Sequence, residues 1–262
     1  MKVFSFRNLR ITILLILLAL AAIYAQDQRL NTTSWYKPIT VTIFPINGDG
    51  QQKTDDYIAG LSSQDFYDID EFFIKNAEKF DLIAQQPIIT MLGDTVTEMP
   101  PEPPHNRQSV LSTIFWSLGL RYWAFNNTPD SLSNSNRIRL YVIYHQENGK
   151  PLAHSLGLQK GLIGVIHAYA DKQQNQQNSI VLAHEIFHTV GAHDKYDGQN
   201  LPLYPVGYAQ PDKQPLHPQR YAEIMAGRVA LSADKAKMPA SLKYVMVGKE
   251  TAKEINWIPS EQ

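Results

Sequence analysis

The side chains best placed to do chemistry lie in residues 184–188, which read H-E-x-x-H. On a helix, His184 and His188 share a face because they are four residues apart, so both imidazoles can reach one ion. Imidazole is a good zinc ligand, and a catalytic zinc site keeps one position open for water. Glu185 would lie beside the ion, where that water needs a general base. The pattern predicts a Zn²⁺ cofactor held by His184 and His188, with Glu185 as the catalytic residue.

A third ligand is expected just after this helix. Gly191 can end the helix in a left-handed conformation and turn the chain back toward the ion. Asp194 follows three residues later and offers a carboxylate oxygen, so the register favours it as the third ligand. His193 is a rival, because a shift of one residue in the loop would present its imidazole instead.

The whole string, H-E-x-x-H-x-x-G-x-x-D, resembles the signature of the metzincin metallopeptidases, which usually ends in histidine. Residues 223–227 read E-I-M-A-G and resemble the metzincin Met-turn, in which a methionine, here Met225, packs beneath the metal. The resemblance covers residues 180–228. Gly191 argues against Glu223 as a third rival ligand, since the gluzincins, which take a downstream glutamate, need no turn there.

A purely structural interpretation competes with this one. The H-E-x-x-H string also occurs by chance on amphipathic helices whose histidines are half buried. An isolated methionine such as Met225 is usually a core residue. The occurrence of both features in one chain, in the metzincin order, favours the metal site.

The resemblance implies an α+β, zincin-like fold with a twisted mixed sheet and helices. The active-site helix would lie at the cleft, above a small irregular C-terminal subdomain. Alternating β-formers predict strands, and helical spacing of apolar residues predicts helices. The predicted strands are 39–46, 88–92 and 137–144, and the predicted helices are 63–80, 109–125 and 244–255.

Three further segments bear on the expected cleft. By resemblance, residues 156–170 are the edge strand that pairs with an extended substrate. Residues 173–178 are predicted to form a polar loop before the zinc helix, and residues 195–218 an irregular loop beside the cleft. Four tyrosines are candidate hydrogen-bond donors to an oxyanion: Tyr196, Tyr204, Tyr208 and Tyr221.

The N-terminus predicts export. Residues 1–25 combine a basic start with an apolar run at 11–25, as in a signal peptide or an uncleaved signal-anchor. We expect a periplasmic or secreted protein, or one tethered to the inner membrane through residues 11–25. Residues 26–35 are interpreted as a polar spacer and 36–262 as the metallopeptidase-like domain, with an upper part at 36–192 and a lower part at 193–262.

Composition excludes several classes of protein. With 44% apolar and 19% charged residues, the 262-residue chain is typical of globular proteins. It contains no cysteine, which excludes disulfides, cysteine nucleophiles and iron–sulfur clusters. No basic block occurs outside the N-terminus, so we expect no nucleic-acid partner.

These features favour an exported zinc-dependent endopeptidase that acts on a peptide or protein substrate. Two alternatives stay open. One is a membrane-tethered, non-catalytic zinc- or peptide-binding domain of the same fold. The other is a zinc hydrolase of a non-peptide amide, in which ion and base would work in the same way.

Overall fold

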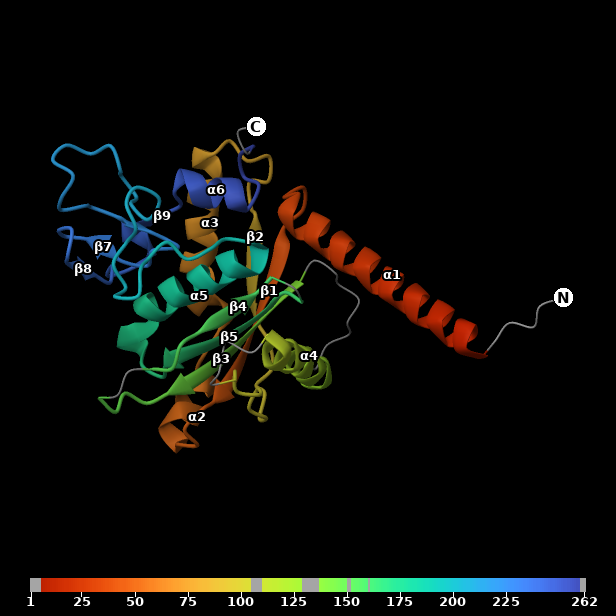
Figure 1. Cartoon of the computed structure of the whole chain (residues 1–262). Coiled ribbons are helices and arrows are strands. Elements are labelled where there is room, and N and C mark those ends of the chain that lie inside the picture. Colours follow the sequence, from red (N-terminus) through yellow and green to blue (C-terminus); the bar gives the residue numbers. More distant parts are fainter. Residues whose placement is uncertain (1–5, 105–109, 129–136, 150–151, 160, 260–262) are drawn as a thin grey trace.

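The computed structural model describes residues 6–104, 110–128, 137–149, 152–159 and 161–259. It is a mixed α+β structure built on one twisted sheet of order β2-β1-β3-β5-β4 (Figure 1). Four strands are parallel: β1 (Ile39–Asn47), β2 (Ile88–Leu92), β3 (Arg137–His145) and β5 (Ile163–Tyr169). The short strand β4 (Leu156–Leu158) pairs antiparallel with β5 and forms one edge. The three predicted strands are confirmed.

The two faces of the sheet carry different helices because successive side chains of a strand point to opposite sides. From β1, Val41 and Ile43 pack in the larger core with α3 (Tyr67–Lys79) and α5 (Asn175–Val190). Phe44 points to the other face and packs with Leu120 of α4 (Val110–Asn126). Figure 1 shows α5 and α4 on opposite sides of the sheet.

The helix predicted at 63–80 is present as a short 3-10 turn, η1 (Ser63–Phe66), followed by α3, and the helix predicted at 109–125 is α4. The helix α2 (Gln52–Ala59) was not predicted, because few of its residues are apolar and Ile58 is its one buried aliphatic side chain.

The predicted polar loop at 173–178 is wrong from Asn175 onward. A 3-10 turn, η2 (Lys172–Gln174), leads into α5, which begins at Asn175. The polar side chains of Asn175 and Asn178 bond to neighbouring elements. Asn175 accepts a hydrogen bond from Tyr57, and the amide of Asn178 bonds both the N–H and the C=O of Tyr169. Helical polar residues therefore tie α5 to β5.

The predicted edge strand at 156–170 also needs correction. The segment forms two strands, and β5 lies inside the sheet between β3 and β4. Only Leu156–Leu158 is at the edge.

The N-terminal helix α1 (Phe6–Thr33) projects away from the domain (Figure 1). Its residues 6–27 are long and apolar enough to cross a membrane, and none of that stretch is buried. The predicted spacer at 26–35 is not an extended linker, because the helix continues to Thr33. Trp35 is 1% exposed, and its indole donates a 2.6 Å hydrogen bond to the carbonyl of Ile255. The folded domain therefore begins before residue 36.

The C-terminal part contains little regular structure, as predicted. It holds two pairs of two-residue strands: β6 (Ala222–Glu223) with β9 (Val245–Met246), and β7 (Val229–Ala230) with β8 (Ala236–Lys237). The 3-10 turn η3 (Leu242–Tyr244) precedes β9. The helix predicted at 244–255 is shorter, because α6 spans Lys249–Glu254.

Candidate metal centre

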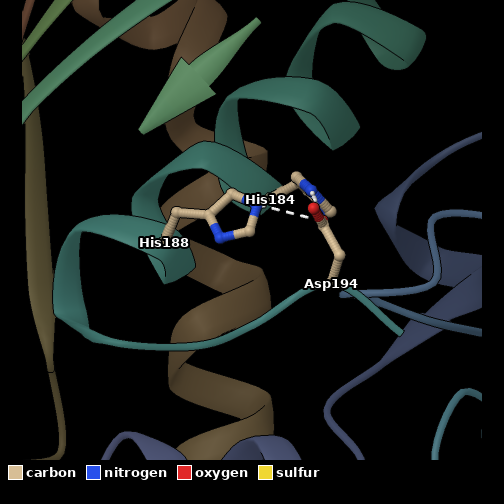
Figure 2. Close-up of side chains that lie close together, drawn as sticks. All are labelled: His184, His188 and Asp194. Carbon is tan, nitrogen blue, oxygen red and sulfur yellow. Dashed lines mark hydrogen bonds and ion pairs between the residues drawn. The ribbon is translucent and has the colours of Figure 1, made fainter. Parts of the chain in front are cut away.

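Three of the predicted site residues meet at one point. His184 and His188 project from the same face of α5, and Asp194 reaches them from the segment that follows the helix (Figure 2). The Nε2 atoms of the two histidines each lie 3.1 Å from Oδ1 of Asp194. The turn that returns the chain is the predicted one, since Gly191 ends α5 with φ of 113°. Any other residue type would be strained at that angle.

Each histidine is oriented by a backbone carbonyl. Nδ1 of His184 lies 2.9 Å from the carbonyl of Ile224, and Nδ1 of His188 lies 2.9 Å from that of Ala192. A carbonyl accepts only, so each Nδ1 donates and each Nε2 faces Asp194. Metal-binding histidines are commonly held in this way, with the second ring nitrogen on a backbone carbonyl.

The distance from Asp194 to each histidine suits a tetrahedral ion. Ligand atoms about 2.0–2.1 Å from zinc at tetrahedral angles lie roughly 3.3 Å apart. The observed separations of 3.1 Å are close to that value. Two imidazole nitrogens and one carboxylate oxygen are also a donor set that zinc accepts at catalytic sites. These residues therefore fit the ion that the sequence predicts.

The charges at the cluster also favour a cation. Burial alone would raise the pKa of Asp194, but hydrogen bonds from His184 and His188 outweigh it and hold this pKa well below its usual range. Burial lowers the pKa of His184, yet the bond to Asp194 and the charge of Glu185 leave it raised overall. The cluster thus draws positive charge onto His184, which a bound dication would supply instead.

Glu185 has the surroundings of a reactive carboxyl group. It is 4% exposed, and among the described residues its buried Oε2 has no hydrogen-bond partner. Burial raises its pKa, and the neighbouring His184 and His188 offset part of that rise. An orphaned buried carboxylate oxygen is costly and calls for a partner such as water or substrate.

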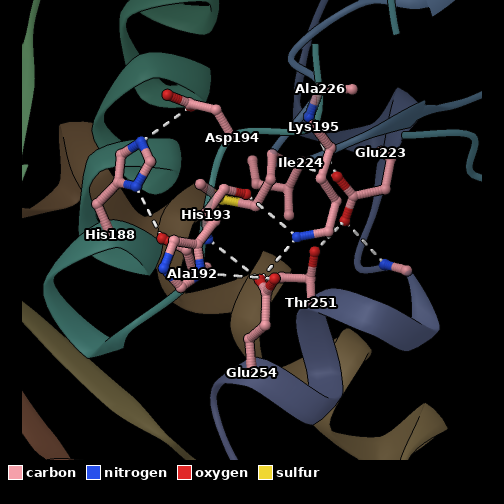
Figure 3. Close-up of polar contacts among 12 residues, drawn as sticks. His188, Ala192, His193, Asp194, Lys195, Glu223, Ile224, Ala226, Thr251 and Glu254 are labelled. Atoms are coloured by element: carbon pink, nitrogen blue, oxygen red, sulfur yellow. Dashed lines mark hydrogen bonds and ion pairs between the residues drawn. The ribbon is translucent and has the colours of Figure 1, made fainter. Parts of the chain in front are cut away.

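Neither rival third ligand faces the cluster. The side chain of His193 is 82% exposed, and its Nδ1 lies 3.5 Å from a carboxylate oxygen of Glu254 (Figure 3). Glu223 is fully buried and accepts hydrogen bonds from the N–H groups of Met225 and Ala226 through Oε2. Its Oε1 accepts bonds from the hydroxyl of Thr251 and the N–H of Gly248.

Glu223 therefore builds the turn predicted at 223–227. Met225 is completely buried in the larger core, to which α5 also contributes, and its N–H is held 2.6 Å from the Glu223 carboxylate. The preceding Ile224 supplies the carbonyl that orients His184. This segment thus acts on the cluster through its backbone, a role that the sequence did not reveal.

The ion pair between Lys195 and Glu254 was also missed. Lys195 directly follows Asp194, and its Nζ lies 2.7 Å from Oε2 of Glu254 and 3.1 Å from the carbonyl of His193 (Figure 3). Its backbone N–H bonds the carbonyl of Met225 at 3.0 Å. The partners are far apart in sequence, and nothing in the local pattern around either residue signals the pair.

The edge strand β4 passes close over α5. A Cβ placed on Gly157 would lie 2.6 Å from the carbonyl oxygen of Glu185 and 2.7 Å from Cβ of His188. Only glycine permits this approach.

Beside β4 lies an open pocket of about 350 Å³ lined by His188, Leu158, Arg121 of α4 and the turn after α5. A larger pocket of about 780 Å³ lies between α3 and the C-terminal part, and no residue of the cluster lines it.

Of the four candidate tyrosines, only Tyr196 adjoins the cluster. Its ring centroid is 6.3 Å from that of His184. Burial, the charge of Asp194 and a hydrogen bond to Asp194 raise its pKa to about 12. Tyr204 and Tyr208 pack against each other, and Tyr221 lines the larger pocket.

Comparison with known proteins adds no relative. No family model matches the chain, and a search of curated proteins finds no significant match.

Proposed function

We propose that this chain is an exported zinc-dependent endopeptidase with a metzincin-like fold. The observation that carries the proposal is the convergence of His184, His188 and Asp194 beside the buried, unpartnered oxygen of Glu185. The donor set, its spacing and the backbone bonds that orient both imidazoles support zinc as the ion.

His184, His188 and Asp194 would hold the ion. Bound zinc would lower the pKa of a coordinated water and polarise the substrate carbonyl. Glu185 then accepts a proton from the attacking water and delivers it to the leaving amine. Burial raises the pKa of Glu185, so this carboxylate takes up a proton more readily than an exposed one. Tyr196 stays protonated at neutral pH, and its hydroxyl would turn from Asp194 to donate a hydrogen bond to the developing oxyanion.

A peptide substrate would extend the sheet. The edge strand β4 is paired on one side only, and Gly157 holds it directly over Glu185 and His188. An extended peptide paired with the outer side of β4 would lie next to the cluster. The adjoining pocket of about 350 Å³ would then receive one substrate side chain.

The apolar stretch of α1 supports export, with the domain held outside the cytoplasmic membrane by an uncleaved anchor. The direct junction between α1 and the buried Trp35 favours an anchor over a removed signal, because the helix ends inside the folded domain.

The test uses the full chain in detergent, purified without chelator and assayed on casein and on a quenched-peptide mixture. We expect about one zinc per chain, cleavage that stops with chelator and returns with zinc, and a loss of about 10²- to 10⁴-fold in Glu185→Gln. Glu78→Gln, at an exposed carboxylate of α3, is the matched control and should keep its activity.

Two results would contradict the proposal. Bound zinc without cleavage of any peptide would favour the binding domain or the non-peptide amide hydrolase. A chain without bound metal would mean that His184 and His188 are ordinary core histidines.

A further inference from the structure

The outward face of α4 is apolar and uncovered. Its exposed residues include Leu111 at 67%, Phe115 at 71% and Tyr122 at 72%. The side chains of this face are Leu111, Ile114, Phe115, Leu118, Tyr122 and Phe125. Successive residues of a helix are rotated by about 100°, so these six occupy one arc of about 100° that contains no charged residue. Surface helices of water-soluble domains normally present polar residues there.

The inward face of α4 is already used. Leu120 and Ala124 are buried in the smaller core against the sheet, and the indole of Trp116 donates to the carbonyl of Pro101. Ser117 and Arg121 line the pocket beside His188. The helix is therefore fixed against the sheet through its other face. The exposed arc is not part of the core of this domain.

The position of α1 suggests what covers the arc. Figure 1 shows α1 leaving the domain on the side where α4 lies. Because Trp35 is buried directly after α1, no slack chain separates the apolar helix from the domain. A bilayer that holds residues 6–27 would therefore lie against this side of the molecule. Aromatic and aliphatic side chains on an uncharged face suit the boundary between lipid headgroups and acyl chains.

We propose that the outward face of α4 is a membrane-docking surface, which lies in the interface of the bilayer that α1 spans. The docking surface rests on the proposed membrane anchor and is independent of peptidase activity, whereas the class of substrate named below rests on the proposed peptidase. Because Ser117 and Arg121 of α4 line the pocket beside His188, docking of α4 would hold this pocket near the lipid surface. The substrates within reach are then the membrane-proximal segments of other membrane-anchored proteins.

The absence of cysteine from the chain makes a direct test practical. Phe115→Cys in the full chain would carry one environment-sensitive fluorophore, with Tyr244→Cys as the matched exposed control in the C-terminal part. Leu15→Cys in α1 would report whether the anchor is in the bilayer. Each protein would be placed in phosphatidylcholine nanodiscs at one chain per disc, with and without spin-labelled lipid. Thermal melting would confirm that each labelled protein is folded.

We expect a blue-shifted label at position 115 that spin-labelled lipid quenches several-fold more strongly than the label at position 244. Quenching at position 15 with none at position 115 would refute the docking surface and leave the anchor standing. Quenching at neither position would overturn the anchor as well. A blue-shifted label at position 115 that spin-labelled lipid does not quench would show that protein, not lipid, covers α4. A blue shift that appears only when two copies share a disc would show the same. Either result would overturn the lipid assignment.

Discussion

Nζ of Lys195 lies 2.7 Å from Oε2 of Glu254, and this pair joins the residue after Asp194 to the last helix. The Lys195 side chain is 4% exposed. The pair fixes the segment that carries the proposed third ligand, and it does so without a disulfide. The geometry of the candidate metal centre therefore depends on a contact that lies outside it.

Removal of one partner of this pair should destabilise the protein. Glu254→Gln removes the anion paired with the buried Lys195 ammonium, which keeps its hydrogen bond to the carbonyl of His193 and a weaker electrostatic interaction with Glu223. We expect a loss of about 3 kcal/mol in urea unfolding of the metal-free protein, together with weaker zinc binding. The double variant Lys195→Met/Glu254→Leu should recover much of the stability, because neither charge remains. Equal losses in the single and double variants would contradict this account.

Metal removal should lower the melting temperature. Binding to the folded state alone adds about 4 kcal/mol when free zinc exceeds its dissociation constant 1,000-fold. For a domain of this size that corresponds to roughly 10 °C, measured by calorimetry with and without chelator. Asp194→Ala should remove most of the difference between the two melting curves, whereas His193→Ala should keep it. A chelator-insensitive melting temperature in the unmodified chain would refute the metal site.

Substitution of Gly157 should impair catalysis more than folding. The Cβ of Gly157→Ala would enter the space of the Glu185 carbonyl and the His188 side chain, so β4 must move outward. We expect about 1–3 kcal/mol of overpacking, which the edge strand can relieve by shifting. The result should be a several-fold loss in kcat/KM with a small change in urea midpoint. Gly198→Ala, which has open space around it, is the control.

Acid should destabilise the protein through His167. Burial, with the nearby His145, lowers its pKa from 6.5 to about 4. Between these values the unfolded chain binds a proton that the folded chain does not, so stability falls as pH drops from about 6.5 to 4. Allowing for its partial exposure, we expect about 2 kcal/mol from this group.

The measurement is the urea midpoint of metal-free protein at pH 7.5 and 4.5. His167→Gln should show a smaller pH dependence than the unmodified chain, since glutamine does not titrate. The same pH dependence in both proteins would show that other groups cause the acid sensitivity.

The junction at Trp35 should matter for stability. Its buried ring packs edge-on against Trp257 at 5.7 Å. Trp35→Ala should cost about 3–5 kcal/mol in urea unfolding, whereas the neighbouring exposed Tyr36→Ala should cost little. Similar midpoints for the two variants would place the start of the domain after residue 36.

The parts of the site that could be predicted from the sequence are those set by local geometry. His184 and His188 share a face because of helix periodicity, and Gly191 turns the chain because a left-handed residue is needed there. The regular strands follow from alternating β-formers. All of these depend on residues within a few positions of one another.

The remaining features depend on contacts between distant residues. Nothing near Glu223 indicates that its carboxylate binds Gly248 and Thr251, and nothing near Trp35 indicates that it reaches Ile255. The start of α5 was missed for a related reason. Its polar residues suggest a loop, but Asn178 satisfies its amide on β5. Such pairs become visible only when the chain is folded.

The junction between α1 and Trp35 also determines how the protein would move. If α1 spans a bilayer, one residue separates the end of the helix from the buried indole, so the domain cannot swing on a flexible stalk. It would rotate and diffuse together with the helix as one body. The pocket beside His188 would then stay at a constant height above the lipid. Lateral diffusion in the plane of the membrane would bring substrates to it.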